Sequence, residues 1–205
     1  SSGIYESFQA EAENQGLEVV AAEAFTADSK TDFKVQLQKA KDGGAELVFL
    51  PVYYQEAALI LQQAKDLDFA PKFFGCDGLD GLLSVENFDT SLAEGVMLLT
   101  PFSATSEDEA SQAFVKAYGD ANNGETPNQF AADAYDVIYA MKAAADAAEI
   151  TPDMANEDIS VAMSEAMLEI ELDGLTGKAT WTEDGECDKE PKAFVIENGE
   201  YKEME

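Results

Sequence analysis

The sequence contains no histidine and no arginine, and its 12 basic residues are all lysines. Ser-His-Asp triads, Cys-His pairs and histidine-ligated zinc sites all need an imidazole, so most hydrolase mechanisms are excluded. The 12 lysines stand against 42 acidic residues, which gives a formal charge of −30. Because this charge is repelled by the phosphates of nucleic acids and by anionic membrane surfaces, we expect neither as a partner.

Long apolar runs are also missing, since a membrane-spanning helix needs about 20 apolar residues and no run in the chain approaches that length. The sequence does not open with the cationic and apolar regions of a signal peptide. Residues 4–15 have the pattern of a helix instead, with Ser1 or Ser2 as its cap. We expect the chain to begin within a longer protein, with any targeting segment upstream.

Glycine-rich phosphate loops are missing too, because Gly43-Gly44 follows a predicted helix and Gly78, Gly81 and Gly95 lack the dinucleotide-binding spacing. A flavodoxin-like enzyme is therefore the least favoured class, and we expect neither catalysis nor a cofactor. The hydrophobic content of 46% is nevertheless enough for a folded core. With 205 residues, the chain forms one long domain or two short ones.

From residue 3 to about 101, helical stripes alternate with short apolar runs, which predicts αβ units that form a parallel sheet. Leu47–Leu50 is a continuous apolar run, typical of a strand that is covered on both faces. We expect helices at 4–15 and 55–67, another between residues 31 and 43, a helical stretch at 81–87, and strands at 18–25, 47–50, 73–75 and 95–100.

The pattern changes after Pro101, which is the best candidate for a domain boundary. Residues 107–119, 128–148 and 156–170 are predicted helices with no strand between them. The clearest apolar stripe consists of Phe130, Ala134, Val137, Ile138 and Met141. The tail returns to strands at 178–182, 192–196 and Tyr201, with turns at Asp184-Gly185 and Asn198-Gly199.

Ligands of open α/β sheets bind beyond the carboxyl ends of the strands, which directs attention to Tyr53-Tyr54 and to Cys76-Asp77-Gly78. The tyrosines open a helix whose first amides favour a ligand carboxylate or the chain's own Glu56. They could equally just cover the sheet edge. Asp77 could hold an ammonium group, with Gly78 allowing close backbone approach, or it could be an ordinary helix or turn cap.

Cys76 and Cys187 are the two cysteines, and the sequence leaves open whether they form a disulfide or stay free. Residues 182–188 are acidic but lack the alternating oxygen ligands of an EF-hand, so a solvated turn is favoured over a calcium site. We therefore expect no metal.

Several segments in succession closely resemble type I periplasmic binding proteins, and within them the branched-chain amino-acid binding proteins of ABC importers. The resemblance covers nearly all 205 residues, and its specificity lies in the collinear order of the motifs. The motifs are Glu6-Ser7-Phe8, Glu23-Ala24-Phe25-Thr26, Asp32-Phe33, Val48-Phe49-Leu50-Pro51, Tyr53-Tyr54, Glu56-Ala57-Ala58, Phe74-Gly75-Cys76-Asp77-Gly78, Ala93-Glu94-Gly95-Val96, Ala113-Phe114-Val115-Lys116-Ala117-Tyr118, Ala134-Tyr135-Asp136, Gly174-Leu175-Thr176-Gly177 and Asp184-Gly185.

The resemblance implies an α/β protein of two lobes, each with a parallel sheet between helices (αβα), that close on a solute in an interlobe cleft. Residues 1–101 and 190–205 would form the second lobe, and 102–189 would return to the first. Tyr53 would cover the ligand and Asp77 would bind its α-ammonium, with Tyr54 and Gly78 beside them. Val52 and Cys76 depart from the family's usual residues, which affects the ligand expected.

The segments that the family places before the first helix are absent from this sequence. The helices at 107–170 would therefore lose surface that they normally cover, so an exposed apolar patch, a swapped partner or a second chain is expected, and the chain could associate with itself. The resemblance implies a solute-binding component of an ABC importer, in the periplasm or as a cell-surface lipoprotein, that binds a small amino acid and contacts a membrane permease. The alternative is a ligand-sensing domain of a receptor with the same fold.

Overall fold

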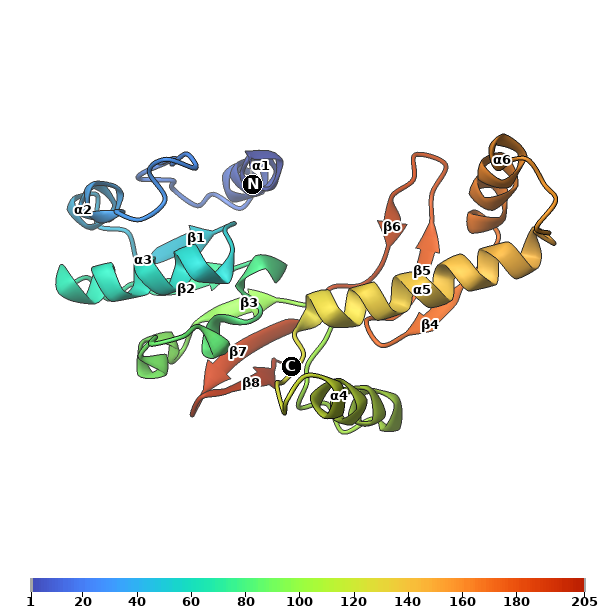
Figure 1. Ribbon diagram of the computed structural model, residues 1–205. Helices are drawn as coiled ribbons and strands as arrows, with labels where there is room; N and C mark the ends of the chain where they lie inside the picture. The colour runs from blue at the N-terminus through green and yellow to red at the C-terminus, as the bar shows by residue number, and fades with distance from the viewer. Residues whose placement is uncertain (1, 205) are drawn as a thin grey trace. The chain divides into compact units, whose positions relative to one another are not determined.

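The computed structural model describes residues 2–204, which divide into two compact units (Figure 1). Unit 1 extends to Thr100 and takes up the chain again at Ala193, whereas unit 2 is Pro101–Lys192. Their correspondence with the second and first lobes of the family stays a prediction. Ser1, one of the two predicted caps of the first helix, lies outside the described residues, and Ser2 is already helical.

Unit 1 contains a five-stranded sheet in the order β1-β2-β3-β7-β8. The first three strands are parallel, as the αβ alternation predicts, and the last two form an antiparallel hairpin that joins β3. The strands are β1 (Leu47–Leu50), β2 (Lys72–Gly75), β3 (Met97–Leu99), β7 (Ala193–Glu197) and β8 (Glu200–Glu203).

Helices cover this sheet and complete the core of unit 1 (Figure 1). Helix α3 buries Ala57, Ile60, Leu61 and Ala64, which are spaced by three and four residues as its predicted stripe requires. Phe8 of α1 stacks on Phe49 of β1, with ring centroids 4.2 Å apart. The helical elements are α1 (Ser2–Asn14), α2 (Lys34–Asp42), α3 (Tyr54–Asp66) and the short 3₁₀ turns η1 (Asp77–Leu79), η2 (Leu82–Ser84) and η3 (Thr90–Ala93).

The strand predicted at 18–25 is wrong. Residues 17–26, all of them described, take no regular secondary structure. Their side chains contact the α2 region instead, where Glu23 binds Lys39 at 2.8 Å and the ring of Phe25 meets Phe33 at 5.1 Å. A β-rich sequence becomes a strand only where a neighbouring strand accepts its backbone hydrogen bonds, and these side-chain contacts place the segment against a helix.

The Asn198-Gly199 turn predicted from the sequence is confirmed. Both residues have positive φ, 55° and 75°, which is the conformation of the tight turn that joins two-residue β-hairpins. The turn sets the register of β7 and β8, in which Ile196 lies opposite Tyr201. The last strand therefore returns along the sheet with Tyr201 partly buried.

Unit 2 consists of three helices and a small antiparallel sheet of order β4-β5-β6 (Figure 1). The three predicted helices are confirmed, and so is the strand at 178–182. The short strand β4 was not predicted, because three residues are too few for a periodicity. The elements are α4 (Glu109–Ala121), α5 (Gln129–Ala147), α6 (Asn156–Met167), β4 (Leu172–Gly174), β5 (Gly177–Trp181) and β6 (Cys187–Asp188).

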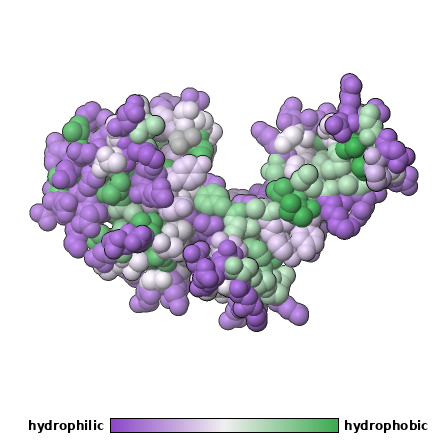
Figure 2. Space-filling view, viewed as in Figure 1, coloured by the Kyte–Doolittle hydropathy of each residue, from purple (hydrophilic) through white to green (hydrophobic). Residues whose placement is uncertain are grey.

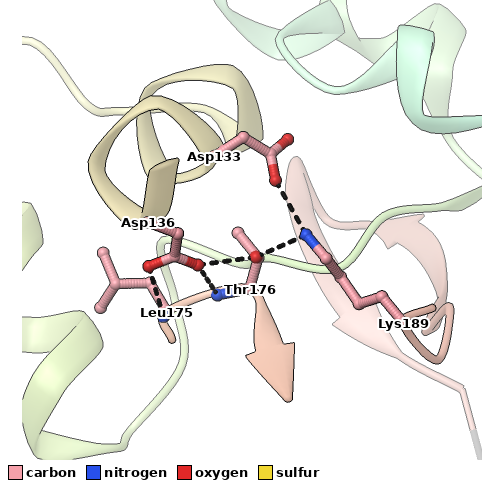
Figure 3. A network of polar contacts seen from close by, with 5 residues as sticks. All are labelled: Asp133, Asp136, Leu175, Thr176 and Lys189. Atoms are coloured by element: carbon pink, nitrogen blue, oxygen red, sulfur yellow. Dashed lines mark hydrogen bonds and ion pairs between the residues drawn. The ribbon is translucent and has the colours of Figure 1, made fainter. Parts of the chain in front are cut away.

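A polar network joins α5 to the β4–β5 turn (Figure 3). The buried carboxylate of Asp136 accepts the backbone N–H of Leu175 at 2.9 Å and both the N–H and the hydroxyl of Thr176, at 2.8 and 2.7 Å. Lys189 donates to the Thr176 hydroxyl at 2.7 Å and to Asp133 at 3.1 Å. A side chain at position 174 would meet the Asp136 carboxylate at 2.5 Å, so this turn requires Gly174.

The apolar stripe predicted on α5 faces solvent. Val137, Ile138 and Met141 are 52%, 64% and 53% exposed, and hydrophobic residues gather along α5 in Figure 2. The exposed apolar surface implied by the resemblance is therefore confirmed, whereas self-association through it stays a prediction. Across the part of the chain that the structure describes, no helix combines the length and the apolar character needed to cross a bilayer.

Candidate functional site

The two predicted ligand segments leave neighbouring strands of unit 1. Strands β1 and β2 are parallel and in register, with Leu50 opposite Gly75. The chain reaches Tyr53 three residues beyond β1 and Asp77 two residues beyond β2. Because the carboxyl ends of parallel strands lie at the same edge of the sheet, Tyr53 and Asp77 both lie at this edge of unit 1.

The two segments are in direct contact at Gly78. A Cβ atom on Gly78 would lie 2.4 Å from the carbonyl oxygen of Val52 and 3.5 Å from the Cα of Tyr53. Real Cβ atoms do not approach a backbone oxygen so closely, so this contact needs a residue without a side chain. Gly78, the residue after Asp77, therefore lies directly against Val52, the residue before Tyr53.

The two tyrosines of the first segment lie in different surroundings. Tyr53 precedes α3 in an extended conformation, its carbonyl accepts the N–H of Ala57 at 3.0 Å, and its side chain is 62% exposed. Tyr54 begins the helix and packs against the core of unit 1. Its ring also lies against Gly81, whose Cβ position is 3.2 Å from a ring carbon. Tyr53 therefore presents its ring to solvent, whereas Tyr54 supports the neighbouring loop.

Asp77 begins the 3₁₀ turn η1 and is exposed. Its backbone carbonyl accepts the N–H of Asp80 at 3.0 Å, and the carbonyl of Cys76 accepts that of Leu79 at 3.1 Å, so the turn is closed by its own backbone. Burial raises the pKa of the Cys76 thiol, and the charge of Asp77 raises it further. The Cys76 thiol therefore stays protonated at neutral pH. Cys76 and Cys187 form no disulfide with each other, and both are free thiols.

The first turn of α3 has an ionic partner from the chain itself. Glu56 lies in that turn and pairs with Lys30 at 3.3 Å, with only 12% of the Glu56 side chain exposed. An acidic side chain in the first turn interacts favourably with the helix dipole. Glu56 therefore places a negative charge in the first turn of α3 and is paired with Lys30.

Sequence patterns missed a contact between the segment that follows Asp77 and the last strand, which joins Gly81 to Tyr201. Gly81 has a φ of +104°, a conformation that favours glycine. Its N–H donates to the hydroxyl of Tyr201 at 3.3 Å, although the two residues are 120 positions apart in the chain. Burial of the Tyr201 hydroxyl and the nearby Asp80 carboxylate raise its pKa to about 12, so the phenol stays neutral at physiological pH. A glycine can be noticed in a sequence, but its distant tyrosine partner cannot.

At residues 182–188 the sequence favoured a solvated turn over a calcium site. The amide of Thr182 donates to Glu186 at 2.9 Å and the amide of Gly185 donates to Thr182 at 2.9 Å, which makes an ordinary hairpin turn. Among residues 2–204, no group of three or more cysteine, aspartate or glutamate side chains is placed to hold a metal ion. The turn at Asp184-Gly185 agrees with the sequence prediction.

Known proteins with sequence similarity are binding proteins. The chain is 27% identical over 136 residues to the "Leucine-, isoleucine-, valine-, threonine-, and alanine-binding protein" of Pseudomonas aeruginosa, a match that covers 66% of this chain and 35% of that protein. This chain thus spans only part of the relative it matches.

Solved structures agree over almost the whole chain. The branched-chain amino acid transporter substrate-binding protein of Streptococcus pneumoniae, in complex with isoleucine, superimposes with a TM-score of 0.77 and 28% identity, over 99% of this chain and 56% of that one. A leucine-binding protein of Thermotoga maritima gives a TM-score of 0.81 at 22% identity, over 100% of this chain and 56% of its own, which supports the fold.

The family described as "Periplasmic binding protein" matches residues 1–197, which is nearly the whole sequence. The match includes both segments at the carboxyl ends of β1 and β2 and the whole of unit 2. The fold expected from the resemblance is therefore confirmed, and the chain belongs to the periplasmic binding protein family, with the fold of its type I members.

Proposed function

We propose that this chain is part of the extracytoplasmic solute-binding component of an ABC importer and that it binds a small amino acid, preferentially a branched-chain one. The observation that carries the proposal is the contact at Gly78, which holds the Asp77 segment against the Tyr53 segment. An exposed carboxylate and an exposed aromatic ring on two contacting segments offer both parts of a site for an ammonium group that carries an apolar side chain.

Each side chain has a distinct task in this proposal. Asp77 binds the α-ammonium of the ligand through a charge-assisted hydrogen bond. Tyr53, exposed at the start of α3, covers the ligand with its ring. Gly78 permits the close approach of the two segments, and Tyr54 supports the loop through Gly81. These groups bind a zwitterion without reacting with it, which agrees with a family and with relatives that are described as binding proteins.

Titration calorimetry with the twenty common amino acids tests the ligand class. We expect heat of binding with leucine, isoleucine or valine, and weaker binding of acidic amino acids, because Asp77 and the charge of −30 repel a second carboxylate. Binding of a ligand without an ammonium group, with no response to any amino acid, would contradict the proposal.

The Asp77→Asn variant tests the assigned residue. Loss of the carboxylate should weaken binding about tenfold or more, since hydrogen bonds to charged groups contribute about 1.5–3 kcal/mol. Asp66→Asn, at the opposite end of α3 from Tyr53, makes the same charge change and serves as the matched control. Equal affinities of the two variants would show that Asp77 does not bind the ammonium.

A membrane permease is the partner that this function requires, because a bound solute must be handed to the importer. In a ligand-sensing receptor domain, the alternative function, the same residues would bind the ligand and the readout would be a signalling segment. Genes adjacent to that of this protein distinguish the two: a permease and an ATPase favour import, whereas a kinase or chemoreceptor favours sensing.

A further inference from the structure

The C-terminal strand of unit 1 contacts the loop that carries Asp77. Tyr201 lies on β8, directly after the Asn198-Gly199 turn that fixes the register of this strand. Its hydroxyl oxygen accepts the backbone N–H of Gly81 at 3.3 Å. Gly81 belongs to the segment 77–84, which contains η1 and η2 and is called here the Asp77 loop.

Gly81 also contacts the other ligand segment. Its Cβ position lies 3.2 Å from a ring carbon of Tyr54, the residue that follows Tyr53. Gly81 therefore contacts the Tyr54 ring and also bonds to the Tyr201 hydroxyl. The positive φ of Gly81 lets the chain turn there without a side chain meeting the ring.

The rest of the Asp77 loop is anchored by packing. Leu79 and Leu82 are fully buried in the core of unit 1, and Gly78 lies against the carbonyl of Val52. Asp77 is exposed at the start of this loop, directly before the buried Gly78 and Leu79. The position of its carboxylate therefore depends on how firmly these contacts hold the turn.

We propose that Tyr201 is a positioning residue that holds the Asp77 loop through Gly81 and so keeps the Asp77 carboxylate beside Tyr53. The part that concerns the ligand rests on the proposed function, whereas the part that concerns the loop does not. Tyr201 does not touch the ligand. It acts from a strand that follows unit 2 in the sequence, so the C-terminal hairpin contributes to a site formed by the N-terminal half of the chain.

The Tyr201→Phe variant tests this role, because it keeps the ring and removes the acceptor of the Gly81 N–H. Hydrogen exchange measured by mass spectrometry on peptides that cover residues 77–84 reports the opening of the loop without any ligand. Leucine affinity measured by calorimetry reports the effect on the site. Ile196→Val is the matched control, since Ile196 is a buried core residue that lies opposite Tyr201 on β7.

We expect exchange in the Asp77 loop to accelerate about three- to tenfold in Tyr201→Phe, because the hydroxyl that accepts the Gly81 N–H is lost. Leucine affinity should fall by a similar factor. Ile196→Val loosens the core but leaves the Tyr201 hydroxyl in place. The exchange rate of the Asp77 loop and the leucine affinity should therefore both stay within about twofold of the values for the parent chain.

Unchanged exchange in Tyr201→Phe would overturn the proposal, and so would equal acceleration in both variants, which would indicate a merely structural role. A normal leucine affinity in a variant with an accelerated loop would also overturn it, because the loop would then not position the site. If the parent chain binds no amino acid, the proposed function fails, and the exchange rates still decide whether Tyr201 holds the loop.

Discussion

The two units of the chain differ in the size of their buried apolar cores. Unit 1 buries 17 residues in one core, among them Leu82, Leu98 and Ile196. The buried cluster of unit 2 is Phe102, Phe114 and Ala132, and its longest helix turns Val137, Ile138 and Met141 to solvent while it buries alanines. Unit 2 thus has the smaller apolar core, and a buried polar network around Asp136 joins its longest helix to its sheet.

The largest expected effect compares a buried leucine with an exposed isoleucine. Leu98→Ala should lower the free energy of unfolding by about 2–5 kcal/mol, because it leaves a cavity in the core of unit 1. Ile138→Ala, at a position 64% exposed, should change it by less than about 0.5 kcal/mol. Urea denaturation followed by far-UV circular dichroism measures both values.

A loss at Ile138 close to that at Leu98 would break this comparison. It would mean that the apolar stripe of α5 is buried in solution, as self-association would bury it. Sedimentation equilibrium at two protein concentrations would then show a dimer in the parent chain and a monomer in Ile138→Glu.

The second effect concerns the polar network of unit 2. Asp136→Ala should lower stability by about 3 kcal/mol, because it removes the acceptor of three hydrogen bonds and leaves the buried N–H of Thr176 and the half-buried N–H of Leu175 unsatisfied. Fluorescence of Trp181, the single tryptophan, follows the unfolding of unit 2.

Asp133→Ala is the control for this network, since it removes a partly exposed partner of Lys189 and leaves the Asp136 bonds in place. Its effect should stay below about 1 kcal/mol. If both substitutions have equally small effects, the network does not stabilise unit 2, and the contrast between the units needs another explanation.

The smallest effect is a pH dependence at the start of α4. Asp108 caps this helix, and its bonds to Ser106 and Ser111 lower its pKa to about 2 from the usual 3.8. A lowered pKa in the folded state contributes stability above about pH 4 and loses it as the pH falls through about 2. Because Asp108 is exposed, we expect no more than about 1 kcal/mol.

Asp108→Asn keeps a good capping side chain and removes the titration. The stability difference between the parent chain and this variant should therefore shrink as the pH is lowered from 4 to 2, in urea titrations followed by Trp181 fluorescence. A difference that is constant over this range would show that Asp108 does not titrate with a lowered pKa.

The sequence predicted much of the fold because its patterns are local. The stripe of α3, the apolar run of β1 and the Asn198-Gly199 turn each fix an element within a few residues, and all three are confirmed. The strand at 18–25 failed because pairing depends on a partner that the local pattern does not contain. The candidate site divides in the same way: the strand ends located Tyr53 and Asp77, and no pattern indicated Tyr201.

The sequence by itself determined most of the helices, strands and turns, since the periodicity of apolar residues and the backbone preference of Asn-Gly act over short distances. Only the tertiary structure decided that Gly78 meets the carbonyl of Val52, that Gly81 bonds to Tyr201, and that the α5 stripe faces solvent. The first two findings are contacts between residues that are far apart in the chain. The third depends on whether another part of the molecule covers that face of α5. An apolar pattern shows that a face tends to be buried, and the rest of the molecule decides whether anything covers it.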